Sequence, residues 1–243
     1  MSDPRPPAST SSFGPAWAAR FGVEDAQPRA APEPVGAVEL AAHLAARMCH
    51  DFISPASAIV SGIDLLEDPS AADMRDDALN LIGASARKLV AQLAFARVAF
   101  GASASAETFD MRDLERLTRG VFEHVRPTLE WSTGLPSLQK PAARALLNLA
   151  QIGAGALPTG GVARVTIAQS GGDALMALEA QGPRARLRPE VVAGLKGEPL
   201  GEGMGGHWVQ AYYLHGLLKA AGGRADYAIA EDKVTLRARA PNA

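Results

Sequence analysis

The sequence predicts an α+β protein in which a long helical hairpin is followed by an α/β sandwich. In the N-terminal half, apolar residues recur at alternating steps of three and four over two long stretches, which is the pattern of two packed helices. The C-terminal half mixes helical stretches with stretches of strand character. The chain has 243 residues, of which 47% are hydrophobic and 21% charged, so it can bury a core.

Composition also narrows the class of protein. A net charge of -2 gives no overall electrostatic signal for nucleic acid. No apolar run is long enough to span a bilayer, and the first residues lack the apolar core of a signal peptide. The single cysteine, Cys49, excludes an intrachain disulfide and fits a reducing compartment. We therefore expect a cytoplasmic protein that binds neither nucleic acid nor membrane.

Residues 1–34 are rich in proline, alanine and serine, so we expect a disordered tail there. The first helix follows this tail and ends at Glu67-Asp68-Pro69, because proline cannot continue a helix. The apolar seam of this helix is unbroken and consists of Val38, Ala42, Ala45, Cys49, Phe52, Ala56, Ile59, Ile63 and Leu66.

A second helix is expected after this break. Ser70, with Asp73 three residues later, has a capping-box pattern and predicts a helix start. Two helices cannot close a core around two apolar seams, so residues 35–101 predict a homodimer in which two hairpins form a four-helix bundle. The alternative is that the hairpin packs on the rest of its own chain. The second seam consists of Leu79, Ile82, Ala86, Leu89, Leu93, Ala96 and Phe100.

Residues 106–243 follow a short linker and form the second predicted domain. Antiparallel strands beside helices favour a sandwich with the helices on one face of a sheet. A turn over Ser170–Asp173 joins two of the strands. The expected helices cover 110–125, 140–156 and 206–221, and the expected strands cover 127–131, 162–169, 174–180, 224–230 and 233–239.

His50 is the candidate catalytic residue. On the heptad of the first helix it lies on the outer face, and Arg47 and Ser54 flank it. A neutral imidazole is a good nucleophile near pH 7 because its reference pKa is about 6.5, and an exposed ring can be reached by a partner protein. Pro55 lies within the same helix, where it removes a hydrogen bond and should bend the helix. Such departures from helix rules are typical of functional sites.

The stretch Met48–Pro55 resembles the phospho-acceptor box of two-component histidine kinases. Ile53 stands where a basic residue is common, and Ser54 replaces threonine or asparagine. The resemblance implies that His50 carries the phosphoryl group and that Asp51 orients the imidazole ring. It also implies that Ser54 lies near the phosphoryl group during transfer.

The second domain resembles the ATP-binding domain of the same kinases. Arg144–Gly161 is similar to its first box, but Ile152 stands where the kinases hold Mg²⁺ with an asparagine. Ala180 replaces the aspartate that reads adenine, while Gly201–Gly206 resembles the glycine-rich phosphate box. An apolar side chain offers no ligand to Mg²⁺ and no acceptor to the adenine amine. We therefore expect a degenerate histidine-kinase ATP-binding domain over 106–243 with no ATP, cofactor or metal site.

Together these features resemble the ChpT-type histidine phosphotransferases of alphaproteobacteria. The family implies a phosphorelay in which His50 receives the phosphoryl group from a receiver aspartate of a hybrid histidine kinase. His50 would then pass the group to receiver aspartates of response regulators that control the cell cycle. The receiver is expected to supply Mg²⁺. Arg47 is expected to support His50, and the expected receiver-binding residues are Ile53, Ser57, Arg184, Arg186 and Arg188.

Three alternatives remain open at this point. The chain could be a non-catalytic pseudokinase scaffold that binds and sequesters receiver domains. It could be an active kinase with divergent ATP binding, which Ile152 and Ala180 oppose. Metal hydrolysis through His43 and His50 lacks a third ligand at suitable spacing.

The row formed by Arg184, Arg186 and Arg188 also has a second interpretation: it could equally be an ordinary solvated loop.

Overall fold

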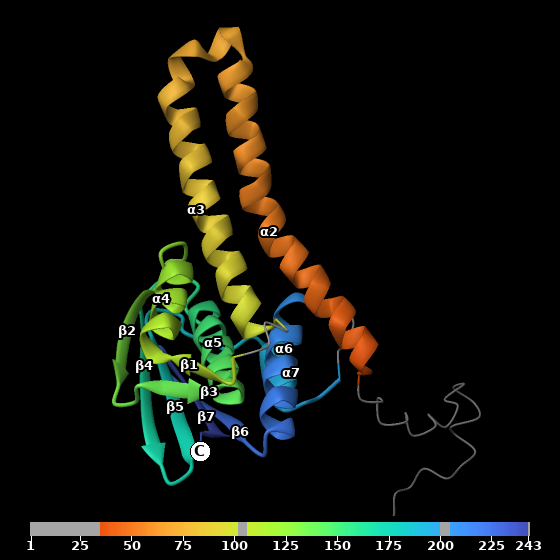
Figure 1. The fold of residues 1–243 in the computed structure, drawn as a ribbon, viewed down its shortest axis with the longest axis vertical. Coiled ribbons are helices and arrows are strands. Elements are labelled where there is room, and N and C mark those ends of the chain that lie inside the picture. The colour runs from red at the N-terminus through yellow and green to blue at the C-terminus, as the bar shows by residue number, and fades with distance from the viewer. Residues whose placement is uncertain (1–34, 102–105, 200–204, 243) are drawn as a thin grey trace, which may run out of the picture. The chain divides into compact units, whose positions relative to one another are not determined.

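The computed structural model of this chain describes residues 35–101, 106–199 and 205–242. The predicted tail, the middle of the linker and most of the glycine-rich box therefore lie outside the described residues. The elements (Figure 1) are α2 (Ala37–Glu67), η1 (Pro69–Met74), α3 (Arg75–Ala99), β1 (Thr108–Asp110), α4 (Met111–Phe122), β2 (Thr128–Thr133), β3 (Ser137–Gln139), α5 (Lys140–Gly155), β4 (Val162–Ser170), β5 (Asp173–Gln181), α6 (Pro189–Leu195), α7 (Gly205–Ala220), β6 (Arg224–Ala230) and β7 (Lys233–Pro241).

Helices α2 and α3 lie side by side and form the predicted hairpin (Figure 1). They approach closely at Gly62, because a Cβ atom there would lie 2.6 Å from Cγ1 of Ile82 and 3.1 Å from the carbonyl oxygen of Ala78. Pro55 is buried and shares this helix face, since it lies seven residues before Gly62. Helix α2 runs through Pro55 as one element.

The expected helix start at Ser70 is wrong. The side chain of Asp68 is the cap instead, because its Oδ1 accepts hydrogen bonds from the backbone N and the Oγ of Ser70, at 2.8 and 2.7 Å. These two bonds lower the pKa of the exposed Asp68 carboxyl. Pro69 then opens the 3₁₀ helix η1, and α3 begins only at Arg75. A proline at the first helical position favours this earlier, tighter turn.

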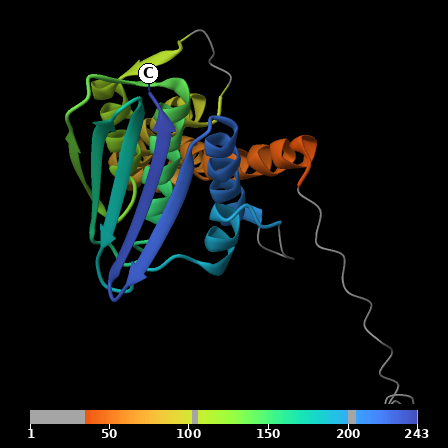
Figure 2. The ribbon, with the colours of Figure 1, turned by 90° about the horizontal axis from the view of Figure 1, so that it is seen from below.

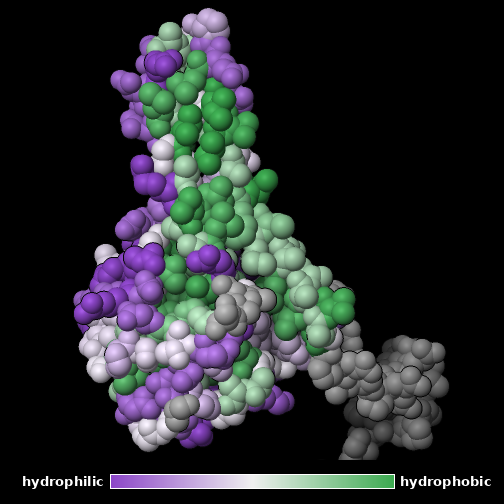
Figure 3. Space-filling model, viewed as in Figure 1, coloured by the Kyte–Doolittle hydropathy of each residue, from purple (hydrophilic) through white to green (hydrophobic). Residues whose placement is uncertain are grey.

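An apolar stripe on the hairpin remains uncovered. Most of the exposed large apolar residues of the described chain lie on α2 and α3, and Figure 3 shows them as a green surface along the hairpin. The N-terminal part of α2 contacts α7, where the His43 and Trp208 rings pack edge to face with centroids 6.1 Å apart. The hairpin thus packs partly on its own chain. The exposed stripe consists of Val38, Val60, Ile63, Leu79, Val90 and Leu93.

The C-terminal domain is a five-stranded sheet in the order β2-β4-β5-β7-β6, with helices on one face (Figure 2). Strand β2 runs parallel to β4, and the other neighbours are antiparallel. Burial alternates along β4 and β5, so one face of these strands meets the helices and the other faces solvent. Helix α5 packs against β5 and β7, and it fills the centre of the core. The predicted α+β architecture is confirmed.

Two small features were not expected from the sequence. Strands β1 and β3 form a two-stranded antiparallel ribbon of three residues each, which is too short for a periodic pattern. Helix α6 has seven residues and starts at Pro189. In the part of the chain that the structure describes, no helix is long and apolar enough to cross a membrane.

Candidate phosphotransfer site on the hairpin

His50 projects from α2 with 88% of its side chain exposed. Its Nδ1 atom lies 3.4 Å from Oδ1 of Asp51, the next residue in the helix. A carboxylate can only accept, so this contact places the proton of a neutral ring on Nδ1. The lone pair then lies on Nε2, the ring nitrogen that has no hydrogen-bond partner among the described residues. The site therefore presents a nucleophilic nitrogen to solvent.

Asp51 contacts a second residue of the same helix. Its Oδ2 atom lies 3.4 Å from Nε of Arg47, which is one helical turn earlier. Only 15% of the Arg47 side chain is exposed, because it reaches from α2 into a cleft of the C-terminal domain. Its Nη1 group donates to the backbone carbonyl of Gly206 in the first turn of α7. His50, Asp51 and Arg47 thus form one contact chain that ends on the other domain.

The remaining hairpin residues of the predicted site lie on the surface of α2. Ser54 and Ser57 are exposed, and Ile53 is 62% exposed. Ser57 lies on the same face of α2 as His50, because the two residues are seven apart. None of the three has a side-chain contact to His50 in the structure. They provide an accessible surface around the ring.

The three predicted arginines follow β5. Arg184, Arg186 and Arg188 are exposed while Ala185 and Leu187 between them are buried, as the alternation predicts. The segment is a turn and an irregular stretch, however, and Arg184 has a positive φ of 61°. The backbone N of Arg184 donates to Oδ1 of Asp232, 2.8 Å away.

Arg186 and Arg188 line a cleft that Arg184 does not reach. Arg47 lines the same cleft from α2, and its volume is about 200 Å³. Among the described residues, no carboxylate lines it. The predicted basic row is therefore divided: two of its members share a cleft with the arginine next to Asp51, and one lies outside.

The former nucleotide positions lie in or beside this cleft. Ile152 and Gly155 line it, and the Ile152 side chain is buried. Ala180 is fully buried within β5. Within the described residues, no group of three His, Cys, Asp or Glu side chains could hold a metal ion.

A cluster of amide side chains reaches from the cleft into the core and was missed from the sequence. Nε2 of Gln210 donates to Oε1 of Gln151 at 2.6 Å and to Oδ1 of Asn148 at 3.3 Å. Nδ2 of Asn148 donates to the carbonyl oxygen of Ala99, at the end of α3, at 3.2 Å. The available signal was the pair of amide residues, Asn148 and Gln151, among the apolar residues in the second half of α5.

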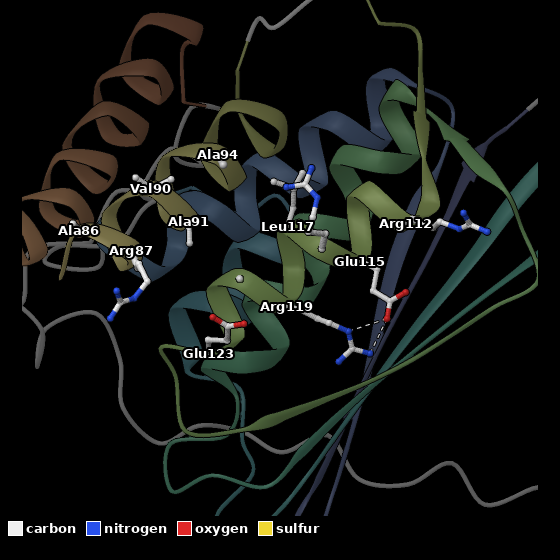
Figure 4. Close-up of a pocket in the computed structure, with 12 residues that line it drawn as sticks. Ala86, Arg87, Val90, Ala91, Ala94, Arg112, Glu115, Leu117, Arg119 and Glu123 are labelled. Atoms are coloured by element: carbon white, nitrogen blue, oxygen red, sulfur yellow. Dashed lines mark hydrogen bonds and ion pairs between the residues drawn. The ribbon is translucent and has the colours of Figure 1, made fainter. Parts of the chain in front are cut away.

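A further groove lies between α3 and α4, and none of the predicted site residues lines it. It has a volume of about 850 Å³. Figure 4 shows Ala91 and Ala94 of α3 opposite Leu117 of α4, with charged side chains at the rim. Glu115 and Arg119 form an ion pair at this rim, with 2.7 Å between their charged groups.

The fold and the exposed histidine define a class of protein: phosphotransferases that resemble histidine kinases. The family model described as the histidine phosphotransferase C-terminal domain matches residues 111–233 of this chain. The protein phosphotransferase ChpT of Brucella abortus (strain 2308) is 37% identical over 205 residues, covering 84% of this chain and 97% of that protein. The chain therefore belongs to the histidine phosphotransferase family, and phosphotransfer is its activity.

A solved phosphotransferase structure agrees with this family. A structure described as a 1.7 Angstrom structure of a bacterial phosphotransferase covers 86% of this chain and all of its own, with a TM-score of 0.77 and 32% identity. The catalytic domain of histidine kinase ThkA covers 56% of this chain and 94% of its own, with a TM-score of 0.44 and 15% identity.

Proposed function

We propose that His50 receives a phosphoryl group from a receiver aspartate of a hybrid histidine kinase and passes it to receiver aspartates of response regulators. The observation that carries this proposal is the geometry of the ring. Asp51 faces Nδ1 while the imidazole is 88% exposed, so Nε2 is accessible to a second protein. This arrangement supports the resemblance of Met48–Pro55 to a phospho-acceptor box.

The proposed step is an in-line displacement at phosphorus. Nε2 of His50 attacks the phosphoryl group of the receiver's aspartyl phosphate, an N–P bond forms, and the P–O bond to the aspartate breaks. The aspartate leaves as a carboxylate, and Asp51 stabilises the positive charge of the ring through the Nδ1 proton. The reverse step passes the group to the next receiver. Such transfer depends mainly on positioning and charge neutralisation, and the receiver's Mg²⁺ supplies part of the latter.

The donor is a receiver rather than ATP in this proposal. Ile152 and Ala180 occupy the positions where the resemblance expects oxygen ligands, and both are buried. The cleft beside them has only about 200 Å³. These observations support a chain that neither binds a nucleotide nor holds a cofactor or metal of its own.

The docking surface proposed for receivers has two parts. Ile53 and Ser57 flank His50 on α2, where an apolar side chain can meet a receiver helix. Arg186 and Arg188 lie at the cleft that also includes Arg47. Receiver active sites are acidic, so the exposed Arg186 and Arg188 would raise the rate of encounter and select partners. Arg184 adds positive charge outside the cleft.

The exposed stripe on the hairpin supports a homodimer. Val38 on α2 and Leu93 on α3 belong to the predicted seams, and both are exposed in the single chain. A contiguous apolar surface of this kind usually marks a protein interface. Pairing with a second hairpin would bury it in a four-helix bundle and present two His50 sites, in a protein that we expect to work in the cytoplasm.

The test is a phosphotransfer assay with a radiolabelled, phosphorylated receiver. Acid-labile, base-stable label on the wild type, and none on His50→Gln, would support the relay. A protein that binds the receiver without becoming labelled would instead be the pseudokinase scaffold. Labelling from ATP alone would identify an active kinase.

A further inference from the structure

We propose that Arg47 is a positioning residue that couples the His50 site to the C-terminal domain. The inference rests on the phosphotransfer role of His50. The Arg47 guanidinium contacts Asp51 through Nε at 3.4 Å and the Gly206 carbonyl oxygen through Nη1. A guanidinium has five N–H donors in a rigid plane, so it can hold two acceptors in a fixed relation. Asp51 is thereby tied to the first turn of α7.

Helix α7 is itself anchored to the end of the hairpin. Gln210, one turn further along α7, donates to Gln151 and Asn148 of α5. Asn148 in turn donates to the carbonyl oxygen of Ala99, which has no intrahelical partner because it lies in the last turn of α3. Arg144 of α5 donates to the carbonyl oxygen of Gly101, two residues beyond the end of α3. The contacts therefore run from α2 through α7 and α5 to α3.

This series of contacts passes through α5, the helix that carries the metal-binding asparagine in the kinases that the chain resembles. Asn148 is fully buried and Gln210 is 2% exposed, so their hydrogen bonds are shielded from water and are expensive to break. The degenerate domain thus has a structural use for its first box: it fixes the two helices of the hairpin relative to α7.

The consequence for chemistry passes through Asp51. The carboxylate fixes the His50 ring through Nδ1, and Arg47 fixes the carboxylate. In the absence of Arg47, Asp51 could rotate away from the ring. Misplacement of a reacting group by about 1 Å can lower a rate by about 100-fold. Arg47 should therefore act on the rate of transfer and leave receiver affinity nearly unchanged.

The first experiment measures single-turnover transfer from a phosphorylated receiver domain that labels the wild type, over a range of receiver concentrations. We expect Arg47→Gln to lower the maximal rate by about 10- to 100-fold, with the half-saturating receiver concentration unchanged within about twofold. Arg47→Lys keeps the charge but cannot span both acceptors, so it should recover less than half of the rate. The matched control is Arg87→Gln on α3, whose exposed side chain has no ion pair among the described residues.

Three results would overturn the inference: an unchanged rate in Arg47→Gln, a loss confined to the half-saturating concentration, or full activity in Arg47→Lys. A wild type that accepts no label at all would instead overturn the proposed function. These outcomes keep the two proposals separable.

The second experiment tests the coupling through α7. Gln210→Ala should lower the maximal rate severalfold. Its combination with Arg47→Gln should cause little further loss, because both changes interrupt the same series of contacts. Losses that multiply would show independent action and contradict the coupling. Thermal melting verifies that the Gln210→Ala protein is folded at the assay temperature. If it is not folded, Gln151→Ala replaces it, because Gln151 is the half-buried partner in the same hydrogen bond.

Discussion

Gly62 of α2 lies against Ile82 of α3 so closely that the hairpin has no room for a side chain at this position. A Cβ atom on Gly62 would lie 2.6 Å from Cγ1 of Ile82 and 3.1 Å from the backbone oxygen of Ala78. The close approach at this glycine sets the packing of the two helices above the His50 site.

Gly62→Ala should therefore destabilise the protein although alanine is the better helix former. We expect a loss of about 1–3 kcal/mol in the free energy of unfolding, since the helices must move apart. Gly83→Ala on α3 is the matched control, because a Cβ there meets only the flexible end of Arg87, at 3.4 Å. That control should gain up to about 1 kcal/mol. Urea unfolding at one protomer concentration measures both, and a stable Gly62→Ala protein would refute the packing argument.

The dimer proposal predicts the behaviour of a charge placed in the exposed stripe. Leu93→Glu should convert the dimer to a monomer, because a buried carboxylate without a partner costs several kcal/mol. Leu175→Glu serves as the control, since Leu175 is an exposed leucine on β5, away from the hairpin. Light scattering coupled to size exclusion gives the masses. A monomeric wild type, or a Leu93→Glu protein that stays dimeric, contradicts the proposal.

The proposal that the C-terminal domain binds no nucleotide is tested directly by calorimetry. ATP with Mg²⁺ should give no binding heat at millimolar concentration, because Ile152 and Ala180 offer neither a metal ligand nor an adenine acceptor. Incubation with radiolabelled ATP should leave His50 unlabelled. Saturable binding in the micromolar range would show that the degenerate domain has kept a ligand.

The arginine cleft makes a prediction about receiver affinity. Arg186→Glu combined with Arg188→Glu should raise the half-saturating receiver concentration and reduce its dependence on salt, because attraction to an acidic receiver surface becomes repulsion. Arg184→Glu should have a smaller effect, since Arg184 does not line the cleft. Arg224→Glu, on the exposed β6, makes the same change in net charge as Arg184→Glu and half that of the double variant, and it serves as the control. Equal binding by all four proteins would contradict docking at the cleft.

Much of this fold follows from local patterns in the sequence. The seams of α2 and α3 and the strands around the Ser170–Asp173 turn are periodic over many residues, and periodicity over such lengths is informative. Ser70 failed as a helix start because Asp68 competes for the same backbone N–H and Pro69 favours a 3₁₀ turn. A capping pattern alone does not say which of two neighbouring acceptors takes the bond.

The site was only partly predictable for a different reason. Asp51 follows His50 in sequence, so their contact is local. The contact of Arg47 with Gly206 joins residues 159 positions apart, and the Gln210–Asn148 bond spans 62. Tertiary packing alone brings such residues together, and one sequence carries no periodic signal for it. The division of the arginine row likewise depends on a turn at Arg184 that alternation does not reveal.

The most direct test is the transfer of label from a phosphorylated receiver to the wild type, His50→Gln and Asp51→Asn proteins. The wild type should take up one acid-labile phosphoryl group per chain within the assay time, and His50→Gln should take up none. Asp51→Asn should take it up more slowly, because an amide does not stabilise the charged ring. Uptake by His50→Gln equal to that of the wild type would contradict the central claim.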